Sequence, residues 1–193
     1  MKNTKKALVL ILCLVFSITI FSCGSIKSVS GVWEFTVNDD SIDRGTSTIV
    51  MTIAEEVIDG KTFTTYHFKG VVTDAFIYGA VDATLTPDEK TLEALKAASA
   101  ISFKMIADGR TYIVEAPLST VTDWGFHRYT MKTEPGVVKE YNIDMSWFIQ
   151  PSWVQPVRFN RDHLTSLRIQ TTSFAEDGAG PFEFKVWDIK IYP

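Results

Sequence analysis

The sequence has 193 residues, of which 19 are basic and 23 acidic, giving a net charge of −4 at pH 7. Three basic residues and no acids precede position 23, so the remainder of the chain is more acidic than the whole. Nucleic acids and anionic lipid headgroups favour cationic surfaces, and we therefore expect neither as a partner. Both cysteines lie within the first 23 residues, so the rest of the chain must be stable without an internal disulfide.

The N-terminal segment has the order of a secretory signal. Three lysines precede the apolar stretch 7–22, which is shorter than the roughly 20 residues of a membrane-spanning helix. The following Ile20-Phe21-Ser22-Cys23 resembles the lipobox of bacterial lipoproteins. The resemblance implies that residues 1–22 are a lipoprotein signal peptide and that Cys23 becomes the diacylated N-terminus. An uncleaved anchor helix and an ordinary signal peptide are the alternatives.

The small, polar residues that follow are typical of a flexible link. We expect residues 23–31 to be a lipidated tether and residues 32–193 to form one domain, because no second linker or repeat interrupts them. This domain would be held at a membrane of the bacterial cell envelope by its N-terminal lipid, at the outer membrane or on the periplasmic face.

From residue 32 onward, short runs of β-branched and aromatic residues alternate with turn residues, a pattern typical of an all-β protein. Asp59-Gly60 predicts a hairpin turn, and Asp108-Gly109 predicts a second tight turn. The predicted strands cover residues 33–37, 46–53, 63–70, 101–105, 111–116, 126–132, 137–147, 164–171 and 182–191. A β-sandwich or a barrel fits this number of strands.

Two segments depart from simple alternation. The first is predicted to be one short helix at about 87–97, lying as a cap beside a sheet edge. Its signals are Thr86 as the N-cap, Pro87 at the first helical position and apolar residues at spacings of three. In the last strand, Phe184 and Val186 share a face, but the apolar phase changes after Trp187-Asp188. This change predicts a β-bulge, since a regular strand keeps a period of two.

The last third of the chain resembles a known fold. Leu167–Gln170, the Gly/Pro turn at 178–181 and Phe182–Tyr192 resemble the closing hairpin of galactose-binding-like jelly rolls. The chain is similar in particular to the complex I intermediate-associated protein 30 family and to family 11 carbohydrate-binding modules. Residues 100–104 with 108–112 resemble their paired central strands. The resemblance implies a jelly-roll β-sandwich with one inserted helix.

No residue pattern indicates catalysis. The three histidines form no HExxH pair, and neither a GxSxG nor a GxxxxGK[ST] motif occurs. Glu115, Asp123 and Asp144 are available as glycosidase carboxylates, but solvated or turn-capping acids are common in a β-protein of this size. We therefore expect the protein not to be an enzyme.

Several residues suit carbohydrate binding, in which aromatic rings stack on sugar faces and planar polar groups bind hydroxyls. Arg168 and Gln170 alternate with apolar Leu167 and Ile169, so we expect them to point away from the core. The candidate stacking and lining residues are Trp124, His127, Tyr129, Trp147 and Trp153. Each of these has the alternative of a core position.

The fold resemblance also implies a structural metal. Galactose-binding-like proteins often hold Ca²⁺ between the bend after the first strand and an acid of the last strand, and Asp39, Asp40 and Asp188 occupy corresponding places. The residues themselves leave open an Asx turn for the first two and a salt bridge for Asp188.

These observations predict a non-catalytic envelope lipoprotein whose β-sandwich binds carbohydrate on one sheet face. The alternative is a protein–protein interaction or assembly module of the envelope. A row of exposed aromatic and planar polar side chains on one face would favour the first, and an exposed apolar patch without such a row would favour the second.

Overall fold

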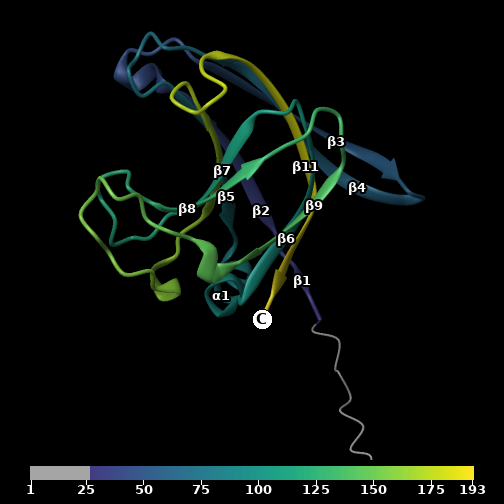
Figure 1. The fold of residues 1–193 in the computed structure, drawn as a ribbon. Helices are drawn as coiled ribbons and strands as arrows, with labels where there is room; N and C mark the ends of the chain where they lie inside the picture. The colour runs from purple at the N-terminus through teal and green to yellow at the C-terminus, as the bar shows by residue number, and fades with distance from the viewer. Residues whose placement is uncertain (1–26) are drawn as a thin grey trace, which may run out of the picture.

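The computed structural model describes residues 27–193, and the predicted signal peptide and Cys23 lie outside the described residues. Two antiparallel sheets face each other as a jelly-roll β-sandwich (Figure 1), which confirms the predicted fold class. Among residues 27–193, no helix has the length and apolar character that crossing a membrane would require.

Sheet I has the strand order β3-β4-β11-β6-β9, with β1 added to β11; sheet II has the order β2-β5-β10-β7-β8. The strands of sheet I are β1 (Val29–Ser30), β3 (Thr48–Ile58), β4 (Lys61–Val72), β6 (Ala100–Ala107), β9 (Lys139–Asp144) and β11 (Gly180–Tyr192). Those of sheet II are β2 (Trp33–Asn38), β5 (Ala80–Pro87), β7 (Thr111–Ala116), β8 (His127–Lys132) and β10 (Leu167–Thr172).

One of the predicted turns closes a hairpin. Asp59 and Gly60 have positive φ values of 52° and 76° and connect β3 to β4, as the sequence predicted. Asp108-Gly109 instead connects β6 in sheet I to β7 in sheet II, so these two strands do not pair. Strands β10 and β11 likewise belong to different sheets and do not pair, although the resemblance had implied that they form a closing hairpin. Turn chemistry reveals that the chain reverses, but it does not reveal which sheet the next strand joins.

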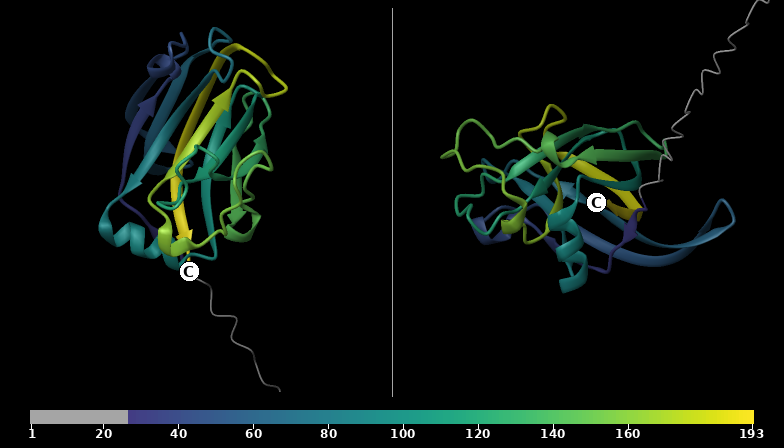
Figure 2. Two further views of the ribbon diagram at one scale, coloured as in Figure 1. Left: turned by 90° about the vertical axis from the view of Figure 1, so that its left-hand side faces the viewer. Right: turned by 90° about the horizontal axis from the view of Figure 1, so that it is seen from below.

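The predicted helix exists but begins later than expected. Asp88, not Thr86, is the N-cap of α1 (Glu89–Ala97), because its side chain accepts a hydrogen bond from Thr91 N at 2.8 Å. Pro87 is the last residue of β5, a strand that the sequence reading missed. The helix lies at the end of the sandwich that also carries the C-terminus (Figure 2), and its Leu95 is fully buried.

The first described residues already belong to the sandwich. Val29 and Ser30, which fall within the predicted tether, pair with Ile191 and Lys190 at the end of β11. The segment is therefore attached to sheet I by two residues before the first strand of sheet II begins.

Strand β11 carries much of the core. Phe184 is 2% exposed and lies with its ring centroid 4.8 Å from that of Phe68 and 4.9 Å from that of Tyr112, so it packs rings from both sheets together. The register of β11 against β6 shifts between Trp187 and Lys190, and Asp188 has φ 54°. The predicted bulge is confirmed.

Candidate functional site

The outer face of sheet II is a polar surface that crosses all five strands. Its side chains point outward because their neighbours in sequence, such as Leu85, Ile169 and Val114, are buried in the core. One cross-strand row consists of Thr36, Thr84, Arg168, Glu115 and Arg128. The next row consists of Asn38, Asp82, Gln170, Ile113 and Thr130. The left view of Figure 2 shows this sheet from its outer side.

Arg168 is the central side chain of this face. Its guanidinium donates a hydrogen bond to Asp82, and its Nη1 lies 3.3 Å from Glu115 Oε2. Asp82 also accepts hydrogen bonds from Asn38 Nδ2 at 3.0 Å and Thr84 Oγ1 at 2.7 Å. The Arg168 side chain is 11% exposed and both acidic side chains are 6% exposed, so the guanidinium is held rigidly.

Two aromatic rings cover the guanidinium of Arg168. The Trp124 and Phe126 ring centroids lie 5.9 and 5.4 Å from its central carbon, within cation–π range. Both rings come from the loop between β7 and β8. Trp124 is nevertheless 73% exposed, and it has a positive φ of 63°, which is uncommon for a large side chain. The loop therefore presents an indole to solvent directly beside the polar centre of the face.

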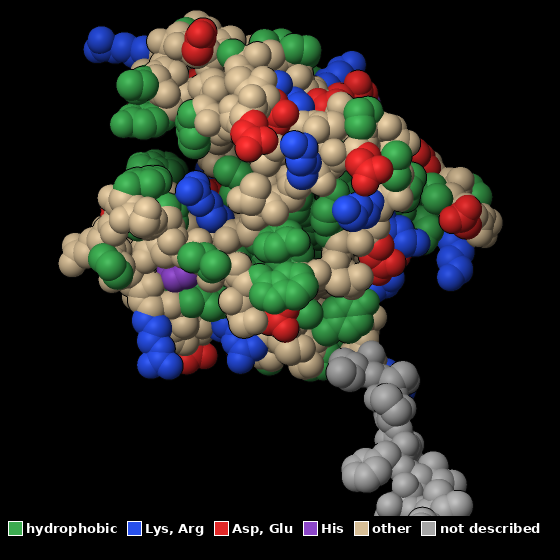
Figure 3. All heavy atoms as spheres, in the orientation of Figure 1, with side chains coloured by type: hydrophobic (Ala, Val, Ile, Leu, Met, Phe, Trp, Pro, Cys, Tyr) green, Lys and Arg blue, Asp and Glu red, His purple; other side chains and the backbone are tan. Residues whose placement is uncertain are grey.

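Loops at the opposite end of sheet II form a second border of the face. Ile42, Ile77, Tyr78 and Phe174 are 57–88% exposed on the loops that follow β2, β4 and β10. The loops are joined to each other, since Ser173 N donates to Gly79 O at 2.8 Å and the Thr46 and Thr73 hydroxyls lie 2.9 Å apart. Figure 3 shows the molecule hollowed on its left-hand side, between two projecting regions.

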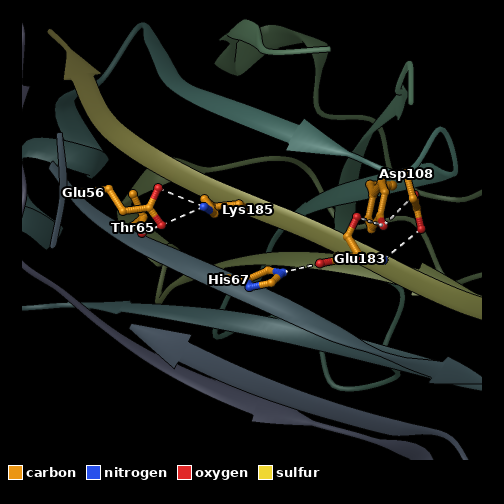
Figure 4. Close-up of polar contacts among 7 residues, drawn as sticks. Glu56, Thr65, His67, Asp108, Glu183 and Lys185 are labelled. Atoms are coloured by element: carbon orange, nitrogen blue, oxygen red, sulfur yellow. Dashed lines mark hydrogen bonds and ion pairs between the residues drawn. The ribbon is translucent and has the colours of Figure 1, made fainter. Parts of the chain in front are cut away.

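The two outer faces differ in how their polar groups are satisfied. On sheet I, Lys185 Nζ lies 2.7 and 2.9 Å from the Glu56 oxygens, and His67 Nε2 lies 2.7 Å from Glu183 Oε1 (Figure 4). These cross-strand pairs satisfy four of the polar side chains on that face. On sheet II, the Gln170 amide and the Arg128 guanidinium have no hydrogen-bond partner within residues 27–193, and both are partly exposed.

Burial changes the acid–base behaviour of Glu115. Desolvation raises the pKa of Glu115 to about 7. The positive charge of Arg168, which also pairs with Asp82, lowers this pKa but does not offset the effect of burial. Consistent with this, Glu115 Oε2 is buried and accepts no hydrogen bond from any described residue. The pKa of Arg168 is raised by Asp82 and Glu115, despite the opposing effect of burial, so it stays charged.

This pKa predicts a pH-dependent stability. Because the folded-state pKa of Glu115 lies above the unfolded value of 4.5, the folded protein holds a proton that the unfolded chain releases, and stability falls as pH rises from about 4.5 through about 7. The Glu115→Gln variant should lack this loss. We expect its stability relative to wild type to rise by on the order of 2 kcal/mol between pH 5 and pH 8. Urea unfolding at both pH values measures it, and parallel profiles would contradict it.

The structure separates the seven predicted ligand residues. Arg168 and Gln170 point outward as predicted, and Trp124 lies over Arg168. His127 is 4% exposed, with its ring centroid 5.0 Å from that of Phe159, and burial lowers its pKa. It is therefore a core histidine and not a ligand contact, because alternation turns it to the inner side of β8.

The remaining three predicted residues lie elsewhere. Tyr129 also points to the inner side of β8, where it stacks on Trp147 with ring centroids 5.8 Å apart. Trp147 is half-exposed, and Trp153 is 67% exposed on the loop that follows. These residues border the edge of the sandwich and not the floor of the outer face.

The predicted calcium ligands do not come together. Asp39 caps the 3-10 helix η1 (Asp40–Asp43), and Asp40 is buried with hydrogen bonds from Ser47 N at 2.9 Å and Ser47 Oγ at 2.6 Å. Asp188 pairs with Lys104 and Lys190 near the other end of β11. Within residues 27–193, no three potential metal ligands among His, Cys, Asp and Glu form a cluster. The three carboxylates do not fit a shared Ca²⁺ site.

The sequence reading did not assign Asn38, Asp82 or Arg128 to this face, and it considered Glu115 only as an available glycosidase carboxylate. Asp82 alternates with Val81 and Ala83, a signal of a strand face that could have been found in the sequence. Glu115 follows a run of apolar residues, so its burial could have been predicted from the sequence. Its proximity to Arg168 could not. That proximity depends on β7 pairing with β10.

The fold is that of a galactose-binding-like jelly roll, and the outer face of one of its sheets is polar. Residues 25–186 match the family model described as complex I intermediate-associated protein 30, and the chain belongs to that family. No curated protein sequence matches it.

A solved carbohydrate-binding module shares the fold. The family 11 carbohydrate-binding module of a cellulosomal cellulase of Clostridium thermocellum is similar with a TM-score of 0.53 and 15% identity, over 85% of this chain and 88% of that one. A variant of the family 29 carbohydrate-binding module CBM29-2 has a TM-score of 0.33 and 10% identity, over 83% and 91% of the two chains.

Proposed function

We propose that this protein is a non-catalytic lipoprotein of the cell envelope that binds carbohydrate on the outer face of sheet II. The observation that carries the proposal is the guanidinium of Arg168, fixed by two buried acids and bordered by the exposed ring of Trp124. Such an arrangement offers a stacking surface and oriented polar groups at the same place, which is the chemistry of a sugar site. The family 11 module with the same fold supports the choice of ligand class.

Binding without catalysis is favoured by the state of the carboxylates. A glycosidase needs one acid free to donate a proton and a second to act as base or nucleophile. Asp82 and Glu115 are nearly buried and both face Arg168. Their role in this proposal is to position Arg168.

The proposed anchor is a lipid on Cys23. Its support is the order of charged, apolar and small residues that ends at Cys23. Mass spectrometry of the mature N-terminus tests it, and Cys23→Ala should release the protein from membrane fractions because acylation supplies its membrane affinity. An unmodified N-terminus would refute the proposal.

The carbohydrate proposal predicts a separation between affinity and stability. Trp124→Ala removes a ring that is 73% exposed, so we expect about a tenfold loss of affinity with an almost unchanged melting temperature. The full chain in detergent micelles is titrated calorimetrically with soluble β-glucan, xylan, mannan and peptidoglycan fragments.

The matched control is Phe63→Ala, which removes a ring from sheet I, where Phe63 lies beneath Lys104. It should leave the affinity unchanged. Failure of every glycan to bind at millimolar concentration would overturn the proposal, as would full affinity in both Trp124→Ala and Gln170→Ala.

The second candidate function is assembly of envelope proteins. It is favoured by the family description and by the apolar residues Ile42, Ile77, Tyr78 and Phe174, which border the face on neighbouring loops. Substituting Ile77 with Ser should weaken binding of a protein partner under this candidate. The glycan titrations above distinguish the two.

A further inference from the structure

A second concave site lies at the edge of the sandwich, where β8 borders the segment that follows β9. It is a shallow pocket of about 550 Å³, within the range of small-molecule sites. Its lining includes Tyr129, Ser146, Trp147 and Pro151. Arg128 and Thr130 line it as well, and both also belong to the outer face of sheet II.

The pocket is held in shape by backbone and side-chain contacts. Arg128 and Ile149 exchange two backbone hydrogen bonds of 3.1 Å, which fasten the loop after β9 to the free edge of β8. Gln150 Nε2 donates to Gly125 O at 2.9 Å, and Gln150 Oε1 accepts from Val157 N at 2.7 Å. These bonds connect the pocket wall to the loop that carries Trp124, so the two sites share a support.

Trp147 supplies an aromatic platform. One side of its ring stacks on Tyr129, with an interplanar angle of 26°, while half of the side chain remains exposed. The 3-10 helix η2 (Met145–Trp147) that carries it is capped by Asp144, whose Oδ1 accepts from Ser146 N at 2.7 Å. The indole is therefore oriented before any ligand arrives, which lowers the entropy cost of binding.

We propose that this pocket is a second sugar subsite, so that the ligand is a chain of linked sugars that crosses β8 and not a single terminal sugar. The inference rests on the proposed function of sheet II and adds the ligand's minimum length. An apolar ring beside Arg128, Thr130 and Ser146 provides the same mixture of stacking and polar groups as the surface around Trp124.

Strand spacing sets the scale of this ligand. Five strands at about 4.8 Å spacing give the outer face a width of roughly 19 Å, and the pocket extends it beyond β8. Arg128 lies at the boundary of the two sites, in the same row as Arg168. Several sugar units placed across the strands would reach from the Arg168 region over Arg128 to Trp147.

The test is a comparison of ligand lengths. Disaccharides and hexasaccharides of β-1,4-linked glucose, xylose and mannose are titrated into the full chain in detergent micelles. For whichever of the three sugars binds, we expect the hexasaccharide to bind at least about tenfold more tightly than the disaccharide. Trp147→Ala should remove most of this gain and leave disaccharide affinity unchanged, and Trp147→Tyr should restore part of it.

Trp153→Ala is the matched control, because Trp153 is an exposed tryptophan of the same segment that does not line the pocket. The Trp153→Ala variant should still bind the hexasaccharide at least about tenfold more tightly than the disaccharide. A hexasaccharide affinity that is equal in wild type and Trp147→Ala would overturn the second subsite while leaving the proposed function intact. If neither this set nor any glycan of the wider panel above binds, the proposed function itself fails.

Discussion

Replacing Arg168 with methionine should destabilise the protein by about 3–5 kcal/mol, since removing one partner of a buried ion pair leaves uncompensated charge. Arg168 is 11% exposed and faces two carboxylates that are each 6% exposed. The methionine fills part of the volume but compensates neither acid. Asp82 keeps its hydrogen bonds from Asn38 and Thr84, whereas Glu115 Oε2 has none within the described residues. Chemical unfolding of the two proteins at pH 8 measures the loss.

The size of this effect should depend on pH and on the remaining acids. Because burial raises the pKa of Glu115 to about 7, protonation at pH 5 should reduce the penalty of losing Arg168. Adding Glu115→Gln to Arg168→Met should recover part of the loss at pH 8. The control is Lys104→Met, which disrupts a more exposed pair with Asp188 at 3.6 Å and should cost less than about 1 kcal/mol. Equal losses in the two single variants would show that the Arg168 cluster is not a buried ion network.

Phe184→Ala should cost about 3–5 kcal/mol, the usual range for removing a buried phenylalanine. The ring stacks on Phe68 from β4 and contacts Tyr112 from β7 edge-on, so its loss leaves a cavity between the two sheets. For a domain of this size the melting temperature should fall by roughly 6–20 °C. Calorimetric or circular-dichroism melting measures the change.

Phe174→Ala is the control for Phe184→Ala. This phenylalanine is 57% exposed on the loop before β11, so its removal should change the free energy of unfolding by less than about 0.5 kcal/mol. A loss below 1 kcal/mol in Phe184→Ala would mean that the interior repacks around the missing ring. It would also contradict the central place of β11 in the core.

The orientation of side chains within a strand was predictable from the sequence, because it follows from local geometry. Arg168 and Gln170 alternate with Leu167 and Ile169, and the structure places the first pair outside and the second inside. The bulge at Trp187-Asp188 could be predicted for the same reason, because it interrupts the two-residue alternation of apolar side chains along the strand. His127 was misjudged because its aromatic character was given more weight than its alternation with Arg128.

Contacts between distant strands were decided only by the tertiary structure. Asp82, Glu115 and Arg168 come from β5, β7 and β10, which are far apart in sequence and become neighbours through the order of sheet II. The pairing across Asp108-Gly109 that the resemblance implied was wrong for the same reason, since the consecutive strands β6 and β7 belong to different sheets. Periodicity and turn residues describe the chain only over a few neighbouring positions, so the sequence alone determined the class of fold and which side chains of a strand face inward or outward. The candidate site depends on which strands pair, and that is set by how the whole apolar core is buried.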